Sequence, residues 1–338
     1  MKTFRPSSAI MNGVLQTFRV KKNAASLFKR LSPAAVYSTS PSTPPTWLLF
    51  EDNHLIVCNK PSGVLAQGDS TGDVTMIDQC KQYLAAARGK NPSTVFLGLV
   101  HRIDRVTSGV IVYAKTSKAA ARLSADFRDR LVKKHYMCVV NVCGPAQPSS
   151  LPATLEHLLD SSTAIPVTAT RSTGTGGVNI NTDEGRSGSG KAKNKTVVVY
   201  GSGGKVAELQ YQRIDVDPPL PVSDNRKPPQ ALLLVQPSTG RKHQIRCQMS
   251  HMGWPIVGDY KYAAPQRFKD TRDIALHALV LQVRHPVQRE RNMRFSAPLP
   301  AMWRTRFGSG VDSAAQVVIE RERESGEMRE SRGRYVAP

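Results

Sequence analysis

The chain lacks several features that would place it in a membrane, disulfide or metal class. No apolar run approaches the ~18 residues that a membrane-spanning helix needs. The five cysteines are an odd number without a Cys-x-x-Cys pair; they are Cys58, Cys80, Cys138, Cys143 and Cys247. This spacing excludes a disulfide framework and suits a reducing compartment. Neither the cysteines nor the eight histidines have the spacing of a metal site, so we expect no metal and no membrane segment.

Acidic residues are absent from the start of the chain, where the first one is Glu51. Basic residues recur there from Lys2 to Arg30, among serine, alanine and apolar residues. This composition is typical of an organelle transit peptide, and it predicts a mitochondrial matrix protein. A Pro- and Ser-rich linker ends near Thr46, so we expect residues 1–46 to be a disordered leader and linker. The alternative is a disordered basic arm that binds RNA.

Positive charge dominates the whole composition. The formal net charge is +21 and the pI is about 10.1. Lysine and arginine also recur through the middle of the chain, so a basic leader does not account for all of it. Such an excess predicts a polyanionic partner, and nucleic acid is the natural one. Residues 161–195 differ, because they are rich in Ser, Thr, Gly and Asn; they are typical of a solvated, low-complexity insertion.

The spacing of apolar residues predicts an α+β fold. We expect helices near residues 76–87, 117–130 and 241–252, and strands at residues 54–59, 95–100, 110–114, 133–140, 196–200, 205–213, 231–236 and 276–283. These elements predict a mixed, mostly antiparallel central sheet flanked by helices and loops, with a catalytic cleft, over residues 47–307. Residues 308–338 mix Glu and Arg and are expected to form a charged C-terminal tail, as a solvated or frayed helix.

One charged loop lies between two apolar segments. The run His101-Arg102-Ile103-Asp104-Arg105-Val106-Thr107-Ser108-Gly109 joins the strands expected at residues 95–100 and 110–114. Charges placed between buried strands are costly unless they are paired. The loop is therefore either a structural ion pair or an active site, and taken alone it leaves both possibilities open.

A second basic cluster lies at residues 237–246, with the sequence Pro-Ser-Thr-Gly-Arg-Lys-His-Gln-Ile-Arg. Ser238 and Thr239 are candidate caps for the helix that follows. Cations beside the backbone N–H groups of a helix start suit phosphate groups. The alternative is a solvated basic helix face. Downstream, residues 253–262 form a Gly- and Pro-containing loop whose aromatic residues could pack in the core or stack on bases; these are Trp254, Tyr260 and Tyr262.

Several blocks of the chain, in the same order, resemble the RluA-type pseudouridine synthases. Residues 101–109 resemble the family's His-Arg-Leu-Asp-x-x-Thr-Ser-Gly signature, with Ile103 in place of the usual Leu. The other matching blocks are Lys60-Pro61-Ser62-Gly63, Lys134-His135-Tyr136, Gly240 to Arg246, Gly258-Asp259, and the closing segments from Leu276 to Pro300. Lys242 stands where the family commonly has Thr. The resemblance extends over about residues 47–302, interrupted only by the insertion.

This resemblance implies the pseudouridine synthase fold and an enzyme that isomerises specific uridines in rRNA, tRNA or mRNA. The reaction breaks the N1–C1′ bond, turns the uracil and joins C5 to C1′. By resemblance, Asp104 is the reacting carboxylate, either as a nucleophile or as a base toward C2′. Arg246 is expected to pair with this carboxylate and keep it ionised. Tyr136 is expected to stack on the uracil and to assist removal of the C5 proton.

The remaining expectations concern partners. The basic side chains assigned to RNA binding are Arg102, Arg105, Lys134, Arg241 and Lys242, whereas His101 is expected to be structural. An isomerisation of this kind uses no redox group, metal or nucleotide, so we expect no cofactor, and we expect a monomer. The alternative function is a catalytically silent RNA-binding assembly factor of mitochondrial ribosomes with the same fold. The intact Asp104, Tyr136 and Arg246 argue against that alternative.

Overall fold

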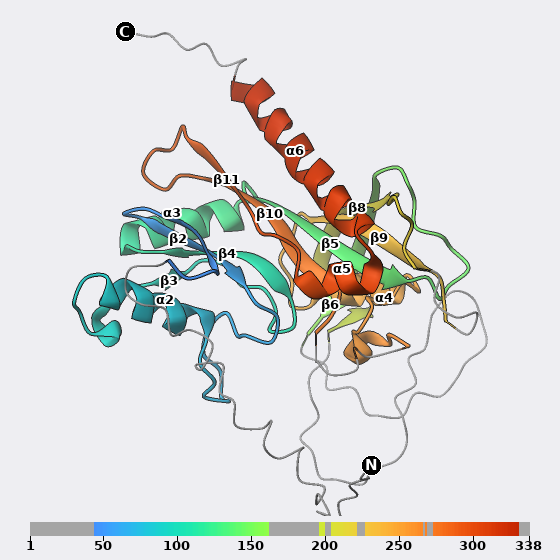
Figure 1. Ribbon diagram of the computed structural model, residues 1–338, viewed down its shortest axis with the longest axis horizontal. Helices are drawn as coiled ribbons and strands as arrows, with labels where there is room; N and C mark the ends of the chain where they lie inside the picture. Colours follow the sequence, from blue (N-terminus) through green and yellow to red (C-terminus); the bar gives the residue numbers. More distant parts are fainter. Residues whose placement is uncertain are drawn as a thin grey trace, which may run out of the picture. The chain divides into compact units, whose positions relative to one another are not determined.

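A mixed β-sheet forms the centre of the fold (Figure 1). The computed structural model describes residues 44–161, 196–199, 204–221, 227–265, 268 and 273–330. Within them the sheet contains β1 (Leu48–Glu51), β2 (Leu55–Lys60), β3 (Gly98–Leu99), β4 (Ser108–Ala114), β5 (Lys133–Asn141), β6 (Ala153–Asp160), β7 (Val197–Val199), β8 (Lys205–Ile214), β9 (Gln230–Pro237), β10 (Leu276–Arg284) and β11 (Asn292–Ser296). Of the predicted leader and linker (residues 1–46), residues 1–43 lie outside the described part of the chain.

The strand order is β1-β2-β4-β10-β5-β9-β8-β6-β7, with β3 paired to β4 and β11 to β10. Each pair is antiparallel except β4 and β10, which run parallel, with His277 opposite Ser108 and Ala278 opposite Gly109. The prediction of a mixed, mostly antiparallel sheet in an α+β fold is therefore confirmed. The start of β4, just after the charged loop, lies in the middle of the sheet.

Two helices cover the N-terminal half of the sheet. Helix α2 (Met76–Ala86) begins with a capping box in which Thr75 and Asp78 exchange hydrogen bonds. Helix α3 (Ser117–Arg128) is capped by the side chain of Thr116. Its apolar residues, spaced three to four apart, pack in a core with residues of β2, β4, β10 and β11; Ala119, Leu123, Leu55, Val112 and Leu281 are members. Both helices match the expected segments to within two residues.

The larger core lies under the C-terminal half of the sheet. It joins β5, β9 and β10 to α4 (Gln244–His251) and α5 (Ala301–Phe307), and its members include Val139, Leu233, Met249, Leu279 and Trp303. The helix α4 is short, and every residue from Gln244 to Ser250 is buried.

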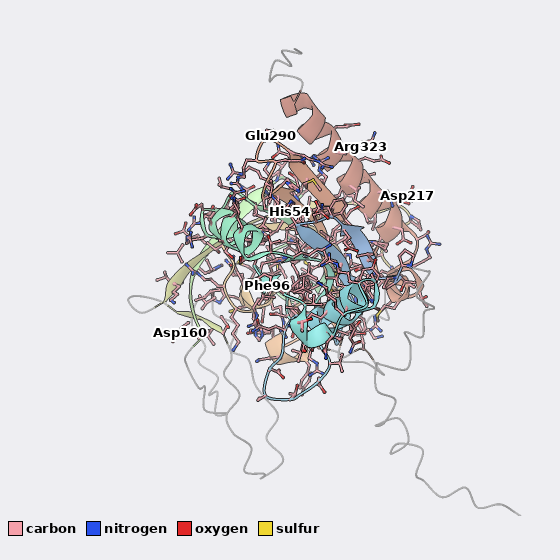
Figure 2. All side chains as sticks on the ribbon, turned by 90° about the vertical axis from the view of Figure 1, so that its left-hand side faces the viewer. His54, Phe96, Asp160, Asp217, Glu290 and Arg323 are labelled. Atoms are coloured by element: carbon pink, nitrogen blue, oxygen red, sulfur yellow. The ribbon has the colours of Figure 1, made fainter. Side chains whose placement is uncertain are left out.

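The segment expected as a charged tail is part of the fold. Residues Gly310–Glu330 form α6, which follows α5 and lies beside β10 (Figure 1), and Figure 2 labels Arg323 on it. Its first half contributes Val311, Ala314, Ala315 and Val318 to the larger core. Glu322 also accepts a hydrogen bond from Gln282 of β10 at 2.9 Å. A helix was expected here, but the expectation that it is solvated is wrong for its first half, whose apolar residues are buried in the core.

One further expectation differs from the structure, and another lies outside the described residues. The strand predicted at residues 95–100 is reduced to β3, and the short 3-10 helix η3 (Pro92–Thr94) precedes it; Val95 and Leu97 are buried as loop residues. The insertion at residues 161–195 lies outside the described residues from position 162. It joins β6, which ends at Asp160 (Figure 2), to its antiparallel neighbour β7.

Among the described helices, none has the length and apolar composition required to cross a membrane.

Candidate active site

The charged loop and the second basic cluster meet at one cleft of about 520 Å³. The loop 100–107 forms one wall, and the C-terminal end of α3 with the start of β5 forms another. The end of β9, the loop 237–241 and the start of α4 complete the lining. Among the residues that face the cleft are Arg102, Asp104, Phe127, Arg130, Lys134, Tyr136, Arg241, His243 and Arg246. Segments more than a hundred positions apart in the chain thus share one site.

Asp104 is held at the first position of a turn. The backbone N–H of Thr107 donates to the carbonyl of Asp104 at 3.0 Å, and the side chain of Ile103 is buried beside it. Residues 60–63 form hydrogen bonds with the backbone of this turn. The N–H of Gly63 and the amine of Lys60 both donate to the carbonyl of Arg105, at 2.8 and 3.2 Å. Two of the blocks that resemble the family are therefore in direct contact.

Lys60 is a buried amine beneath the turn. Its Nζ also donates to the carbonyls of Pro61 and Val64, at 2.8 and 2.7 Å. Burial lowers the pKa of Lys60 to about 7, whereas the negative charge of Asp104 acts to raise it. The amine therefore supports the backbone of the turn, and Lys60 is not among the residues that line the cleft.

The small residues after the turn allow β4 to approach β10 closely. Gly109 has φ +114°, and a Cβ at this position would lie 2.2 Å from the carbonyl oxygen of Ala278. Glycine is the residue that fits such a conformation and spacing. Next to it, the hydroxyl of Ser108 lies 2.9 Å from Nδ1 of the buried His277. These contacts set the position of the strand that carries the turn.

Arg246 connects Asp104 to a second carboxylate. Its Nη1 lies 3.2 Å from Oδ2 of Asp104, while Nε and Nη2 form a two-point hydrogen bond with Asp259 at 2.7 and 2.8 Å. The side chains of Arg246 and Asp259 are 6% and 1% exposed, whereas that of Asp104 is 21% exposed. Burial acts to lower the pKa of Arg246, but the hydrogen bonds and charges of the two carboxylates raise it. The guanidinium is therefore a permanent cation in the wall of the cleft.

Tyr136 and Lys134 come from the start of β5 and line the same cleft. Burial, and to a smaller extent the charge of Asp104, raises the pKa of Tyr136 well above its usual value. Its phenol therefore keeps its proton at neutral pH. Burial lowers the pKa of Lys134 to about 8, and its amine donates to the carbonyl of Thr239 at 3.2 Å.

The five cations that were predicted to bind RNA differ in whether they line the cleft. Arg102, Lys134 and Arg241 line the cleft. Arg105 points elsewhere: its guanidinium pairs with Asp73 at 2.7 Å and donates to the carbonyl of Gly63. Lys242 is exposed at the start of α4, and it is not among the cleft-lining residues.

His101 has a structural position. Its Nε2 accepts a hydrogen bond from the N–H of Val112, and its ring stacks on Phe127 with centroids 4.6 Å apart. Burial, with a smaller contribution from the charge of Lys134, lowers the pKa of His101 to about 3. The ring therefore remains neutral and joins the loop to α3.

One local prediction about the second cluster is wrong, and an alternative that the sequence left open is decided by burial. Ser238 and Thr239 do not cap α4, because the cap position is occupied by His243, whose backbone is left-handed. The hydroxyl of Thr239 instead lies 2.7 Å from the side-chain oxygen of Gln244. Trp254 and Tyr262 are each 1% exposed and belong to the interior, so of the three aromatic residues considered for base stacking only Tyr260 is exposed, at 47%.

The sequence analysis missed three side chains around Asp104: Lys60, Asp259 and His243. All three lie in blocks that matched the family pattern, but the sequence analysis assigned no role to any of them. His243 is adjacent to the predicted cation Lys242, and nothing in its local spacing indicated a left-handed backbone. In the part of the chain that the structure describes, no group of three or more His, Cys, Asp or Glu side chains is placed to hold a metal ion.

Comparison with known proteins identifies the class. Residues 54–251 match the family described as RNA pseudouridylate synthase. This match spans more than half of the chain and contains the turn of Asp104, β5 and α4. The chain belongs to this family and is an RNA pseudouridine synthase of the RluA type.

Individual relatives agree with this assignment. The chain is 31% identical over 261 residues to the dual-specificity RNA pseudouridine synthase RluA of Escherichia coli (strain K12). The aligned region covers 76% of this chain and 95% of that protein. It is 28% identical over 295 residues to the ribosomal large subunit pseudouridine synthase C of Vibrio vulnificus, covering 82% and 77%. The solved structure of human RNA pseudouridylate synthase domain containing 4 shares the fold, with a TM-score of 0.51 and 24% identity over 76% of this chain and 89% of that one.

Proposed function

We propose that this enzyme isomerises uridines at specific positions in RNA and that Asp104 is the carboxylate that reacts with the ribose. The observation that carries the proposal is the position of Asp104 in the cleft. Its carboxylate is partly exposed to the cleft, while Arg246, the cation that pairs with it, is buried and fixed by Asp259. An ionised carboxylate held in this way is suited to attack or to remove a proton at short range.

The reaction requires no added group, because product and substrate are isomers. The N1–C1′ bond of the uridine breaks, and Asp104 either bonds to C1′ or removes the hydrogen at C2′. The freed uracil turns and C5 bonds to C1′, as the Asp104–C1′ bond breaks or the proton returns to C2′, so the carboxylate is regenerated. C5 then loses its proton and N1 gains one, which leaves the composition unchanged. Arg246 favours the ionised carboxylate, since an opposite charge within a few ångströms lowers the free energy of the charged form.

Tyr136 acts in this proposal as a neutral phenol. Its raised pKa disfavours a phenolate base, so the ring supplies a flat surface for the uracil and the hydroxyl supplies a hydrogen-bond donor. This limits the role that the family resemblance implied for it. Removal of the C5 proton by Tyr136 itself would require the proton of the phenol to leave first.

RNA binding in this proposal depends on cations in and around the cleft. Arg102, Lys134 and Arg241 face the site from three of its walls. The target base must leave its stack to reach Asp104, at a cost of a few kcal/mol, and contacts to the flanking phosphates offset that cost. The net charge of +21 favours association with a polyanion of this kind.

The proposal is tested by the release of tritium from RNA that carries uridine labelled at C5. Purified full-length protein is incubated with labelled transcripts of ribosomal and transfer RNA, and product is identified as pseudouridine by mass spectrometry. Asp104→Asn keeps the shape of the side chain and removes its charge, so we expect no tritium release and nearly unchanged RNA affinity. Activity in this variant would overturn the role of Asp104. RNA binding without release by the wild type on all transcripts would favour the assembly-factor alternative.

We further propose that the enzyme works in the mitochondrial matrix, on RNA made there. The support is the acid-free, basic and Ser-rich composition of residues 1–46. A fusion of these residues to a fluorescent protein should enter mitochondria and be shortened by proteolysis. Cytosolic fluorescence would contradict the proposal. Mapping of pseudouridines in organellar RNA with and without the enzyme would then identify the uridine.

A further inference from the structure

His243 lies between Asp104 and a buried tyrosine. It precedes α4 with φ 53° and ψ 26°, and its side chain lines the cleft. Its Nδ1 is 2.9 Å from the hydroxyl of Tyr262, in η4 (Tyr260–Tyr262), and its Nε2 is 3.9 Å from Oδ2 of Asp104. The imidazole therefore connects the interior of the fold with the catalytic turn.

The two neighbours of the ring decide where its proton lies. The oxygen of Tyr262 accepts a hydrogen bond from the backbone N–H of Thr196 at 3.2 Å. If the proton of His243 were on Nδ1, the lone pair of Nε2 would face the negative carboxylate of Asp104, which is electrostatically unfavourable. With the proton on Nε2, the phenol donates to Nδ1 and an N–H faces the carboxylate. The second arrangement satisfies both neighbours.

The groups around His243 favour a neutral ring. Burial lowers the pKa of His243 to about 4, the charge of Asp104 acts to raise it, and the cations Arg246, Lys261 and Lys242 act to lower it. Burial also raises the pKa of Tyr262, so its phenol keeps the proton that it donates. A neutral imidazole has one N–H, and here that N–H points toward Asp104.

Both contacts to the Asp104 carboxylate reach the same oxygen. Arg246 Nη1 and His243 Nε2 lie 3.2 and 3.9 Å from Oδ2, which leaves Oδ1 for the ribose. A separation of 3.9 Å is too long for a hydrogen bond, but bonds at catalytic groups often shorten when substrate binds. We propose that His243 is a positioning residue: its Nε2–H, oriented by Tyr262, donates to Oδ2 of Asp104 in the RNA complex and directs Oδ1 to the sugar. This inference rests on the proposed role of Asp104.

The tautomer can be tested without activity. In full-length protein labelled with ¹⁵N-histidine, we expect the His243 resonances to show a protonated Nε2 and an unprotonated Nδ1 at neutral pH, assigned by their loss in His243→Gln. Tyr262→Phe removes the hydroxyl but keeps the ring that lies under the Arg246 guanidinium, 5.0 Å from its Cζ. We expect this variant to show a mixture of the two tautomers. A protonated Nδ1 in the wild type would overturn the proposal.

Kinetics on a matched pair of substitutions test the positioning role. His243→Gln places an amide N–H near the position of Nε2, whereas His243→Asn is too short to reach Asp104. Asn tolerates the left-handed backbone better than Gln, so a purely structural role predicts that the Asn variant is the better enzyme. We expect the reverse: under single-turnover conditions with saturating enzyme, His243→Asn loses about tenfold or more in rate, the effect of one hydrogen bond to a charged group, and His243→Gln recovers most of it.

Four outcomes separate this inference from the proposed function. Activity in Asp104→Asn would overturn the proposed function itself. An inactive Asp104→Asn together with a fully active His243→Asn would overturn the positioning role alone. Equal losses in the Gln and Asn variants, or a loss confined to KM for RNA, would also overturn it, because the role predicts a change in the chemical step. Thermal unfolding of each variant shows whether it is folded at the assay temperature.

Discussion

The guanidinium of Arg246 is fixed by Asp259 through two hydrogen bonds of 2.7 and 2.8 Å. The pair is buried, so Asp259 determines the plane and direction of the guanidinium. One nitrogen, Nη1, is thereby left to reach Asp104 at 3.2 Å. The electrostatic environment of the proposed catalytic carboxylate thus depends on a residue that does not contact the cleft.

Replacing Arg246 by Lys should impair both activity and stability. A lysine amine cannot make the two-point bond to Asp259 and also reach Asp104, because its donors do not form a planar fork. We expect at least a tenfold loss in single-turnover rate, and a loss of a few kcal/mol in the free energy of unfolding, as for broken buried ion pairs. Arg304→Lys is the control, since its pair with Asp312 is on the surface. Equal effects of the two substitutions would contradict the argument.

Arg102 and Arg105 should differ in their effect on RNA binding, although both lie within two positions of Asp104. Arg102 lines the cleft, whereas the guanidinium of Arg105 is engaged with Asp73 and Gly63. Arg102→Ala should weaken RNA affinity and reduce the slope of log affinity against log salt by about one, as for a lost phosphate contact. Arg105→Ala should change that slope little. A filter-binding titration at several salt concentrations measures both, and the opposite order would show that Arg105 turns to the RNA.

Gly109→Ala should destabilise the fold strongly. The new Cβ would overlap the carbonyl of Ala278, and φ +114° is unfavourable for any residue with a Cβ. We expect a loss of more than about 2 kcal/mol in the free energy of unfolding, which urea denaturation measures. Gly240→Ala is the matched control, because a Cβ there meets nothing within 4 Å. A stable Gly109→Ala would mean that β4 and β10 are less closely paired than the structure shows.

The stability of the enzyme should fall as the pH is lowered from about 6.5 to about 4. Burial lowers the pKa of His277 to about 4, although its hydrogen bond to the carbonyl of Ala297 acts to raise it. In this window the unfolded chain binds a proton that the folded one does not, so each such histidine contributes a slope of about 1.4 kcal/mol per pH unit. His277→Gln should remove one such contribution. An unchanged slope in urea unfolding between pH 7 and pH 4.5 would refute this assignment.

Elements with clear periodicity could be predicted from the sequence. The helices α2 and α3 have caps and a single apolar face, and the strands β5 and β9 have continuous apolar runs, so local patterns were sufficient for them. The strand expected at residues 95–100 was not formed in full, because apolar residues there are buried as a loop. The helix α6 was expected to be solvated or frayed, since its alanines and valines occur among many charges and their burial depends on contacts with residues far away in the chain.

The amino-acid sequence by itself determined that this is a basic α+β protein of the RluA type. It also identified Asp104, Tyr136 and Arg246 as candidate active-site residues. Tertiary structure alone decided how Arg246 is fixed by Asp259, how Lys60 supports the turn, and which way His243 points. These contacts join side chains that are far apart in the chain, such as Arg246 and Asp104, which are 142 positions apart. Pairings of this kind leave no local periodicity, so they are established only when strands and loops assemble around a common cleft.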